Sequence, residues 1–89
     1  MYRFRWNDWN IDHISEHGIS PFEAEYLVQN ARRPYPQHRA DGKWLVWGRT
    51  WSGAMLQVIY TFSPADVVFV IHARPLTEAE KHRFRRRKS

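Results

Sequence analysis

The feature of this chain that most restricts its fold is a succession of three β-rich runs in its second half. They read KWLVWGRT, MLQVIYTF and VVFVIHAR, and only the four-residue segments WSGA and SPAD separate them. Connections this short join antiparallel neighbours, because a parallel pair needs a crossover of about a dozen residues. The last run is apolar on both faces, as is typical of a central or doubly covered strand. The sequence therefore predicts a three-stranded antiparallel meander over residues 43–74.

Capping signals predict helices on both sides of this meander. Ser20 is followed by Pro21 and Glu23, which is the pattern of a capping box with proline at the first helical position. Thr77 and Glu80 repeat the capping-box spacing near the C-terminus, with cations following towards the end. We expect a helix to begin at each of these two places.

Another helix is expected before Ser20. Asn7 or Asp8 can act as its N-cap, Ile11 and Ile14 would point inward, and Gly18 is placed to end it. In the helix that follows, four residues are predicted to fall on roughly one face: Phe22, Tyr26, Leu27 and Ala31.

The remaining segments complete the predicted fold. RRPYPQHRADGK, residues 32–43, carries two prolines and an Asp-Gly, which predict a loop. YRFRW near the N-terminus alternates enough to be a short strand that extends the sheet. We therefore predict an α+β fold, with an antiparallel β-sheet of three to four strands, two N-terminal helices and one C-terminal helix.

Composition sets the size of the domain and the place of its charge. The 89 residues are 43% hydrophobic, with five tryptophans and no cysteine, so a single domain over residues 1–89 must fold by packing alone. The net charge of +5 comes from a basic C-terminal tail, residues 81–89, which holds six of the fourteen lysines and arginines. The other eight lysines and arginines are balanced by nine acidic residues in the rest of the chain. Such a tail is either a solvated terminus or a segment that steers polyanions to the domain.

We expect a cytoplasmic protein without a membrane partner. No run approaches about 18 apolar residues, the length of a membrane span. The N-terminal MYRFRWND also has no apolar stretch of signal-peptide length.

A histidine pair near the end of the first predicted helix has several interpretations. HISEH, residues 13–17, matches the H-x-x-E-H pattern of some zinc proteases, and His13 and His17 would share a helix face. A catalytic zinc needs a third protein ligand, and Gly18 ends the helix at once, so no metal site is predicted. At a helix C-terminus, His17 is instead a candidate acid or base, or a residue that caps the last carbonyls.

Polar residues at strand ends form the second group of candidates. Arg49 ends the run WLVWGR and Arg74 ends VFVIHAR. An arginine fork binds phosphate through two hydrogen bonds, although on a protein surface it also forms ordinary ion pairs. Arg74 lies three residues before Thr77, and a helix N-terminus favours anions. His72 and Arg74 are thus predicted to lie beside a helix start able to hold phosphate.

Aromatic residues on the predicted strands have both structural and functional interpretations. Tyr60 follows QVI in the middle run, where a buried tyrosine is usually a packing residue. Trp44, Trp47 and Trp51 could stack on unpaired bases, but at least two of them are expected in the core.

Several of these strings, taken in order, resemble the BrnT-type toxins, RelE-like ribonucleases of bacterial type II toxin–antitoxin systems. The matching pieces span residues 4–84 and read RWND, HGIS, FEAEYLV, WLVWGRT, VIYT, VIHAR and TEAEKHRF. The resemblance implies a RelE-like α+β fold and cleavage of RNA without a metal or other cofactor. It also implies neutralisation by a cognate antitoxin protein.

The chain departs from that family at identifiable positions. The family often has a lysine just before HG, where this chain has Glu16, and a serine before AR, where it has His72. The last helix of the family commonly reads Glu-Arg and then tyrosine, where this chain has Glu80, Lys81 and Phe84. Loss of this lysine and tyrosine is expected to weaken or abolish cleavage unless His72 replaces part of what they supply, so the sequence leaves undecided whether cleavage is retained.

Cleavage of this kind lets the 2′-hydroxyl attack the neighbouring phosphorus, so the site needs a base, an acid and cations. We predict that a histidine transfers the proton, that two arginines hold the phosphate, and that a tyrosine and a glutamate orient them. The predicted site residues are His17, Arg49, Tyr60, His72, Arg74 and Glu80. The basic tail would add salt-dependent affinity for RNA.

Two other functions remain open at this point. One is a non-catalytic module that keeps the fold and binds nucleic acid or a protein partner. The other is a small metalloenzyme built on His13 and His17. The sequence leaves undecided the RNA preference, ribosome dependence, antitoxin identity and formation of a homo-oligomer.

Overall fold

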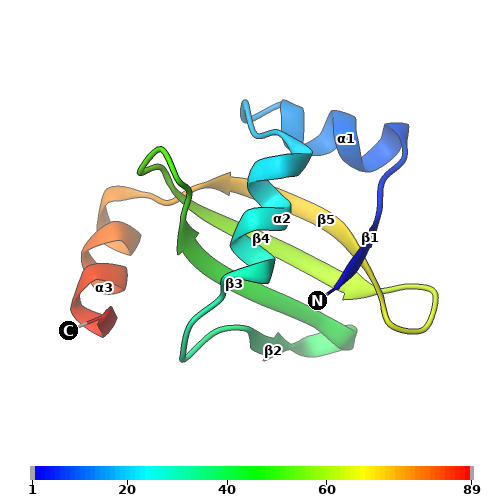
Figure 1. The fold of residues 1–89 in the computed structure, drawn as a ribbon. Coiled ribbons are helices and arrows are strands. Elements are labelled where there is room, and N and C mark those ends of the chain that lie inside the picture. The colour runs from blue at the N-terminus through cyan, green and yellow to red at the C-terminus, as the bar shows by residue number, and fades with distance from the viewer. Residues whose placement is uncertain (1, 89) are drawn as a thin grey trace.

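The computed structural model describes residues 2–88, with side chains described for residues 2–86. The elements, in chain order, are β1 Arg3–Arg5, α1 Asp8–Ser15, α2 Pro21–Gln29, β2 Gln37–Arg39, a 3-10 turn Ala40–Gly42, β3 Lys43–Arg49, β4 Met55–Phe62, β5 Val67–Pro75 and α3 Glu78–Lys88. The strands form one sheet in the order β1-β5-β4-β3-β2 (Figure 1). Within residues 2–88, no helix is long and apolar enough to cross a membrane.

The predicted α+β class and the antiparallel meander are confirmed. β3 pairs with β4 and β4 with β5, both antiparallel. One row of this pairing joins Trp47, Gln57 and Arg74 across the three strands. Because side chains alternate along a strand, the same row sets which residues share a face of the sheet.

The predicted strand count and the all-antiparallel pairing are wrong. β1 pairs with β5 in parallel, from Arg3 opposite Val67 to Arg5 opposite Phe69. β2 lies inside the segment predicted as a loop and pairs antiparallel with the start of β3. Asp41 and Gly42 adopt positive φ angles of 63° and 70°, which reverse the chain between these two strands. The sheet is therefore five-stranded and mixed.

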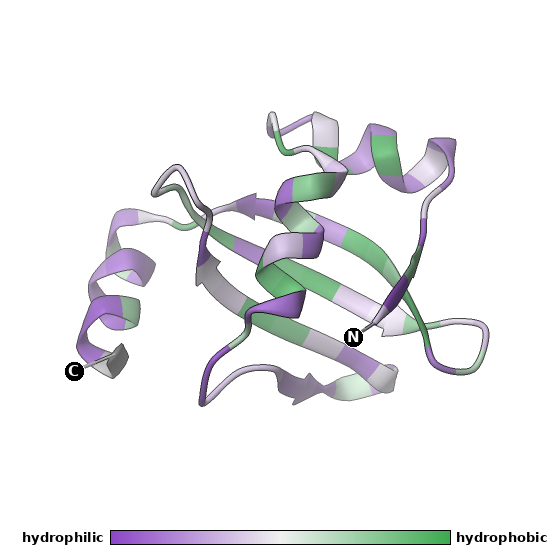
Figure 2. Cartoon of the chain, viewed as in Figure 1, coloured by the Kyte–Doolittle hydropathy of each residue, from purple (hydrophilic) through white to green (hydrophobic). Residues whose placement is uncertain are grey.

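Helix α2 crosses one face of the sheet, here called the α2 face (Figure 1). The helix buries Ala24, Leu27 and Val28, and Figure 2 shows apolar segments on the strands that it crosses. Close approach is possible at Gly48, where an added Cβ would lie 3.0 Å from Cγ of Leu27. The predicted cap is confirmed, since Ser20 and Glu23 form a reciprocal capping box and Pro21 starts the helix.

The predicted apolar face of α2 is only partly correct. Phe22 is 77% exposed and Tyr26 is 38% exposed, while Leu27 is buried. With about 100° of rotation per residue, positions 24, 27, 28 and 31 fall within one arc of about 100°. Positions 22 and 26 lie on the opposite side of the helix, so both aromatic rings face solvent.

Helix α1 lies beside the edge of β5 (Figure 1). Asn7 is its N-cap, in a capping box with Asn10, and Ile14 is fully buried. The inward orientation predicted for Ile11 is wrong, because this side chain is 37% exposed. The helix ends at Ser15, and the turn that follows uses Gly18 at a φ of 72°.

Helix α3 packs at one end of the opposite face of the sheet, here called the α3 face. Its Phe84 is buried, and Arg85 contacts Met55 of β4 at 3.9 Å. The helix extends to Lys88, so residues 81–88 of the predicted basic tail are helical. Figure 2 shows most of this helix as hydrophilic.

Candidate active site

Strand β5 changes face in its middle, and this places His72 and Arg74. Tyr60 pairs with Val70 but Ile59 pairs with His72, so Ile71 is an extra residue in a β-bulge. Without the bulge, His72 and Arg74 would share the α2 face with the buried Val70. A bulge shifts the alternation by one residue, so both side chains lie on the α3 face instead.

Arg74 is held by a network of the protein's own acceptors. Its two terminal nitrogens reach the two carboxylate oxygens of Glu80 at 2.7 and 2.8 Å. The same nitrogens donate to the carbonyl of Pro75 at 3.0 Å and to Oε1 of Gln57 at 3.3 Å. Trp47 also donates to this Gln57 oxygen, at 3.0 Å. All four hydrogens of the two Nη atoms therefore have an acceptor.

Glu80 occupies the start of α3. Its carboxylate accepts the backbone N–H of Thr77 at 2.9 Å, and its own N–H donates to the Thr77 hydroxyl at 3.2 Å, which confirms the predicted capping box. The hydrogen bond from Arg74, followed by that from the Thr77 N–H, lowers the pKa of Glu80 to about 2. The anion expected beside this helix start is thus supplied by the protein itself.

His72 lies two residues before Arg74 on the same face, and its side chain is partly buried. Its ring meets the ring of His17 edge to face, with 6.1 Å between the ring centroids. Burial lowers the pKa of His72, and the neighbouring Arg74, His17 and His13 lower it further. The imidazole is therefore held in its neutral form near pH 7.

His17 lies in the exposed turn that follows α1. Its backbone N–H donates to the carbonyl of Ile14 at 3.1 Å, and the packing of α1 against β5 brings its ring to His72. His13, one turn earlier, stacks instead on Trp9 with a centroid separation of 4.6 Å. Among residues 2–86, no three histidine, aspartate or glutamate side chains are placed to hold a metal ion, which gives the zinc alternative no support.

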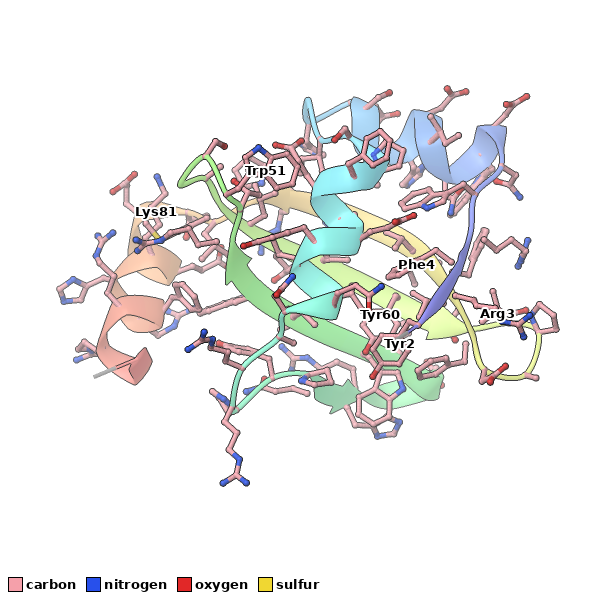
Figure 3. All side chains as sticks on the ribbon, viewed as in Figure 1. Tyr2, Arg3, Phe4, Trp51, Tyr60 and Lys81 are labelled. Atoms are coloured by element: carbon pink, nitrogen blue, oxygen red, sulfur yellow. The ribbon has the colours of Figure 1, made fainter. Side chains whose placement is uncertain are left out.

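Tyr60 is not part of this group. It is 1% exposed on the α2 face, opposite to His72 and Arg74. Burial, together with the neighbouring Tyr2, raises the pKa of Tyr60 to about 12. Figure 3 shows Tyr60 and Tyr2 together, away from Trp51 and Lys81. This tyrosine packs the core, where its hydroxyl has no path to a substrate on the α3 face.

Arg49 lies on the α3 face but at a distance from His72. Leu45 of β3 is in the same pairing row as His72, two strands away, and Arg49 lies four residues further along β3. Strand geometry puts the Cα atoms of Arg49 and His72 on the order of 16 Å apart. The Arg49 guanidinium is exposed and lies 3.9 Å from the sulfur of Met55. The structure therefore joins His17, His72, Arg74 and Glu80, and leaves Arg49 and Tyr60 elsewhere.

Arg49 instead lines a second cavity, which the sequence does not predict. A cavity of about 440 Å³, here called the arginine pocket, is lined by residues that include Arg32, Arg33, Arg49, Tyr26, Trp47 and Trp51. It lies along the end of β3 beyond the part paired with β2. The available signal was the pair of cations in NARRPYP, followed closely by Tyr35 and without an acid in the string.

The two sites differ in what they can do chemically. Two imidazoles in contact, one of them kept neutral, can take up and release protons during a reaction. Three guanidinium groups beside aromatic rings can bind an anionic, planar ligand. Comparison of the chain with protein-family models, with curated proteins and with solved structures found no match.

Proposed function

We propose that this chain is a metal-independent endoribonuclease with His17 and His72 at its catalytic centre. The observation that carries the proposal is the contact between these two rings on the α3 face, 6.1 Å apart and beside Arg74. Proton transfer by two positioned histidines supplies both the base and the acid that cleavage of an RNA backbone needs.

In the proposed reaction, neutral His72 accepts the proton of the 2′-hydroxyl as that oxygen attacks the adjacent phosphorus. The bond from phosphorus to the 5′-oxygen breaks, and protonated His17 donates its proton to this leaving oxygen. The products are a 2′,3′-cyclic phosphate and a free 5′-hydroxyl. The lowered pKa of His72 favours its role as base, since its neutral form predominates at pH 7.

Arg74 and Glu80 are proposed as positioning residues. Because the Nη atoms of Arg74 are engaged by Glu80, Gln57 and Pro75, this guanidinium fixes the end of β5 against α3. Its positive charge lies close enough to lower the pKa of His72. The proposed contribution of Arg74 is therefore to hold the neighbouring base in place and neutral.

The wider role follows from the resemblance to BrnT-type toxins. Under this proposal the chain adopts a RelE-like arrangement, cuts RNA, and is neutralised by a cognate antitoxin protein. The mixed sheet with α2 on one face and α3 at the end of the other is compatible with such an arrangement. The catalytic groups would differ from those of the family, because His72 stands where a serine is common.

The test is digestion of single-stranded RNA by the purified chain, in the presence of a metal chelator. We expect cleavage with 2′,3′-cyclic phosphate ends, and a loss of roughly 10²- to 10⁴-fold in rate for His72→Ala. His17→Ala should also lower the rate, whereas His82→Ala, an exposed position on α3, should not. Absence of cleavage by the unchanged chain, or full activity of His72→Ala, would refute the proposal.

A second candidate is a non-catalytic RNA-binding module on the same fold. The engagement of both Arg74 Nη atoms by protein acceptors and the burial of Tyr60 favour it, since neither these nitrogens nor the tyrosine hydroxyl is open to a phosphate. This candidate predicts salt-sensitive binding to RNA that remains intact after prolonged incubation.

A further inference from the structure

We infer that the arginine pocket binds one nucleotide of a single-stranded RNA, with the phosphate on its arginines and the base on its aromatic rings. The inference depends on the proposed function only for the choice of RNA as ligand. It adds a binding subsite at the end of β3, separate from His72 on β5 and His17 in the turn after α1.

The first support is the charge of the pocket. Arg32, Arg33 and Arg49 are exposed and line one cavity. Among residues 2–86, none of these three guanidinium groups has a carboxylate within salt-bridge distance, and no described residue lining the pocket is acidic. Positive charges that the protein does not neutralise attract an anion, and arginine matches phosphate through paired hydrogen bonds.

The second support is the aromatic surface of the pocket. Trp51, in the turn between β3 and β4, is 61% exposed. Tyr26 meets it edge to face with 5.3 Å between centroids, which braces the indole ring. Base stacking on an exposed aromatic ring is a common basis of single-strand binding.

The third support is the size and surroundings of the pocket. Its volume of about 440 Å³ lies within the range of small-ligand sites, roughly 300–1,000 Å³. Helix α3 borders it through Phe84, and Arg83 of that helix lies 5.5 Å from the centre of the Trp47 ring. The basic helix therefore adds positive potential beside the pocket.

The experiment measures binding of a labelled, 2′-O-methylated single-stranded RNA, which lacks the hydroxyl that cleavage requires. Replacing Arg32, Arg33 and Arg49 together by alanine should reduce the slope of log affinity against log salt by about 2, because each lost phosphate contact contributes roughly 0.7. Trp51→Ala should weaken binding by roughly 5- to 100-fold, and Trp51→Phe should restore most of the affinity.

Matched controls lie outside the pocket. Arg3→Ala removes one cation from β1, where Arg3 pairs with Asp66 at 3.5 Å, and Phe22→Ala removes an aromatic ring that is 77% exposed on α2. Neither should change the RNA affinity by more than about twofold. Circular dichroism and thermal unfolding of every variant will show whether the fold is retained, as expected for substitutions of exposed side chains.

The outcomes separate this inference from the proposed function. His72→Ala should bind the uncleavable RNA as the unchanged chain does, so lost cleavage with retained binding supports both. If the histidine variants cleave normally while the pocket variants lose binding, only the catalytic proposal fails. If folded pocket variants bind RNA normally, or if the pocket takes an acidic antitoxin peptide and no RNA, the inference is overturned.

Discussion

Arg74 and the arginine pocket show two opposite uses of the same side chain. Arg74 is partly buried, and its Nη atoms donate to Glu80, Gln57 and Pro75. Arg32, Arg33 and Arg49 are exposed, and among residues 2–86 they face no carboxylate. An arginine with its own acceptors stabilises the fold, whereas one without them is open to a ligand. Arg49 and Arg74 both lie near the end of a strand, so that position does not distinguish a structural arginine from one open to a ligand.

The largest expected difference is in stability. Arg74→Gln should lower the free energy of unfolding by about 2–3 kcal/mol, because it leaves the Glu80 carboxylate without its charged partner. Arg49→Gln should change the same quantity by less than about 0.5 kcal/mol, since its guanidinium is exposed. Urea unfolding of the two variants measures both values. Equal losses in the free energy of unfolding would show that Arg74 does not stabilise the fold more than Arg49 does.

A smaller loss of stability is expected when Glu80, the ion-pair partner of Arg74, is changed. Glu80→Gln preserves the capping-box geometry but removes the charge, so we expect the free energy of unfolding to fall by about 1–2 kcal/mol at neutral pH. The folded pKa of Glu80 is about 2, below its ordinary value of 4.5, so its stabilisation is present above pH 4.5 and lost as pH falls towards 2.

Urea unfolding across this pH range is the measurement. The difference in free energy of unfolding between the unchanged chain and Glu80→Gln should stay constant above about pH 4.5 and become smaller below it. A gap that does not depend on pH would mean that the ion pair contributes nothing beyond its hydrogen bonds.

The smallest predicted effect is a shift in the pH dependence of RNA cleavage. In the proposed reaction His72 accepts a proton only when it is neutral, so the rate should rise with pH through a pKa below 6.5. Arg74→Gln removes a positive charge that lowers this pKa, and should move the rising limb to higher pH. A limb that stays in place would show that Arg74 does not influence the histidine.

Local signals predicted much of this fold from the sequence. The capping boxes at Ser20 and Thr77 involve residues three apart, and the three strands of the meander are joined by short turns, so both depend on neighbouring residues. The strand β1 was predicted, but its parallel pairing and the whole of β2 escaped prediction for a different reason. The parallel pairing of β1 with β5 joins residues 64 apart, and the polar Gln37–Arg39 lacks the alternation of a half-buried strand.

The candidate site was predicted less well. His72 and Arg74 share a face because they are two residues apart, but the face depends on a bulge at Ile71 that the apolar run does not reveal. The contact of His17 with His72 depends on how α1 packs against β5, across 55 residues of chain. Sequence spacing carries no information on such long-range contacts, so it also does not show that Tyr60 and Arg49 lie away from His17 and His72.

Catalysis is proposed at His17 and His72, and RNA binding at the arginine pocket. The most direct test of this assignment is the cleavage rate of a single RNA turnover, measured over a range of protein concentrations. We expect His72→Ala to lower the maximal rate without changing the half-saturating concentration. The combined replacement of Arg32, Arg33 and Arg49 by alanine should raise that concentration and leave the maximal rate within a few-fold of the unchanged chain. If the pocket variant instead lowers only the maximal rate, or His72→Ala changes only the half-saturating concentration, the assignment of catalysis and binding to these two sites is contradicted.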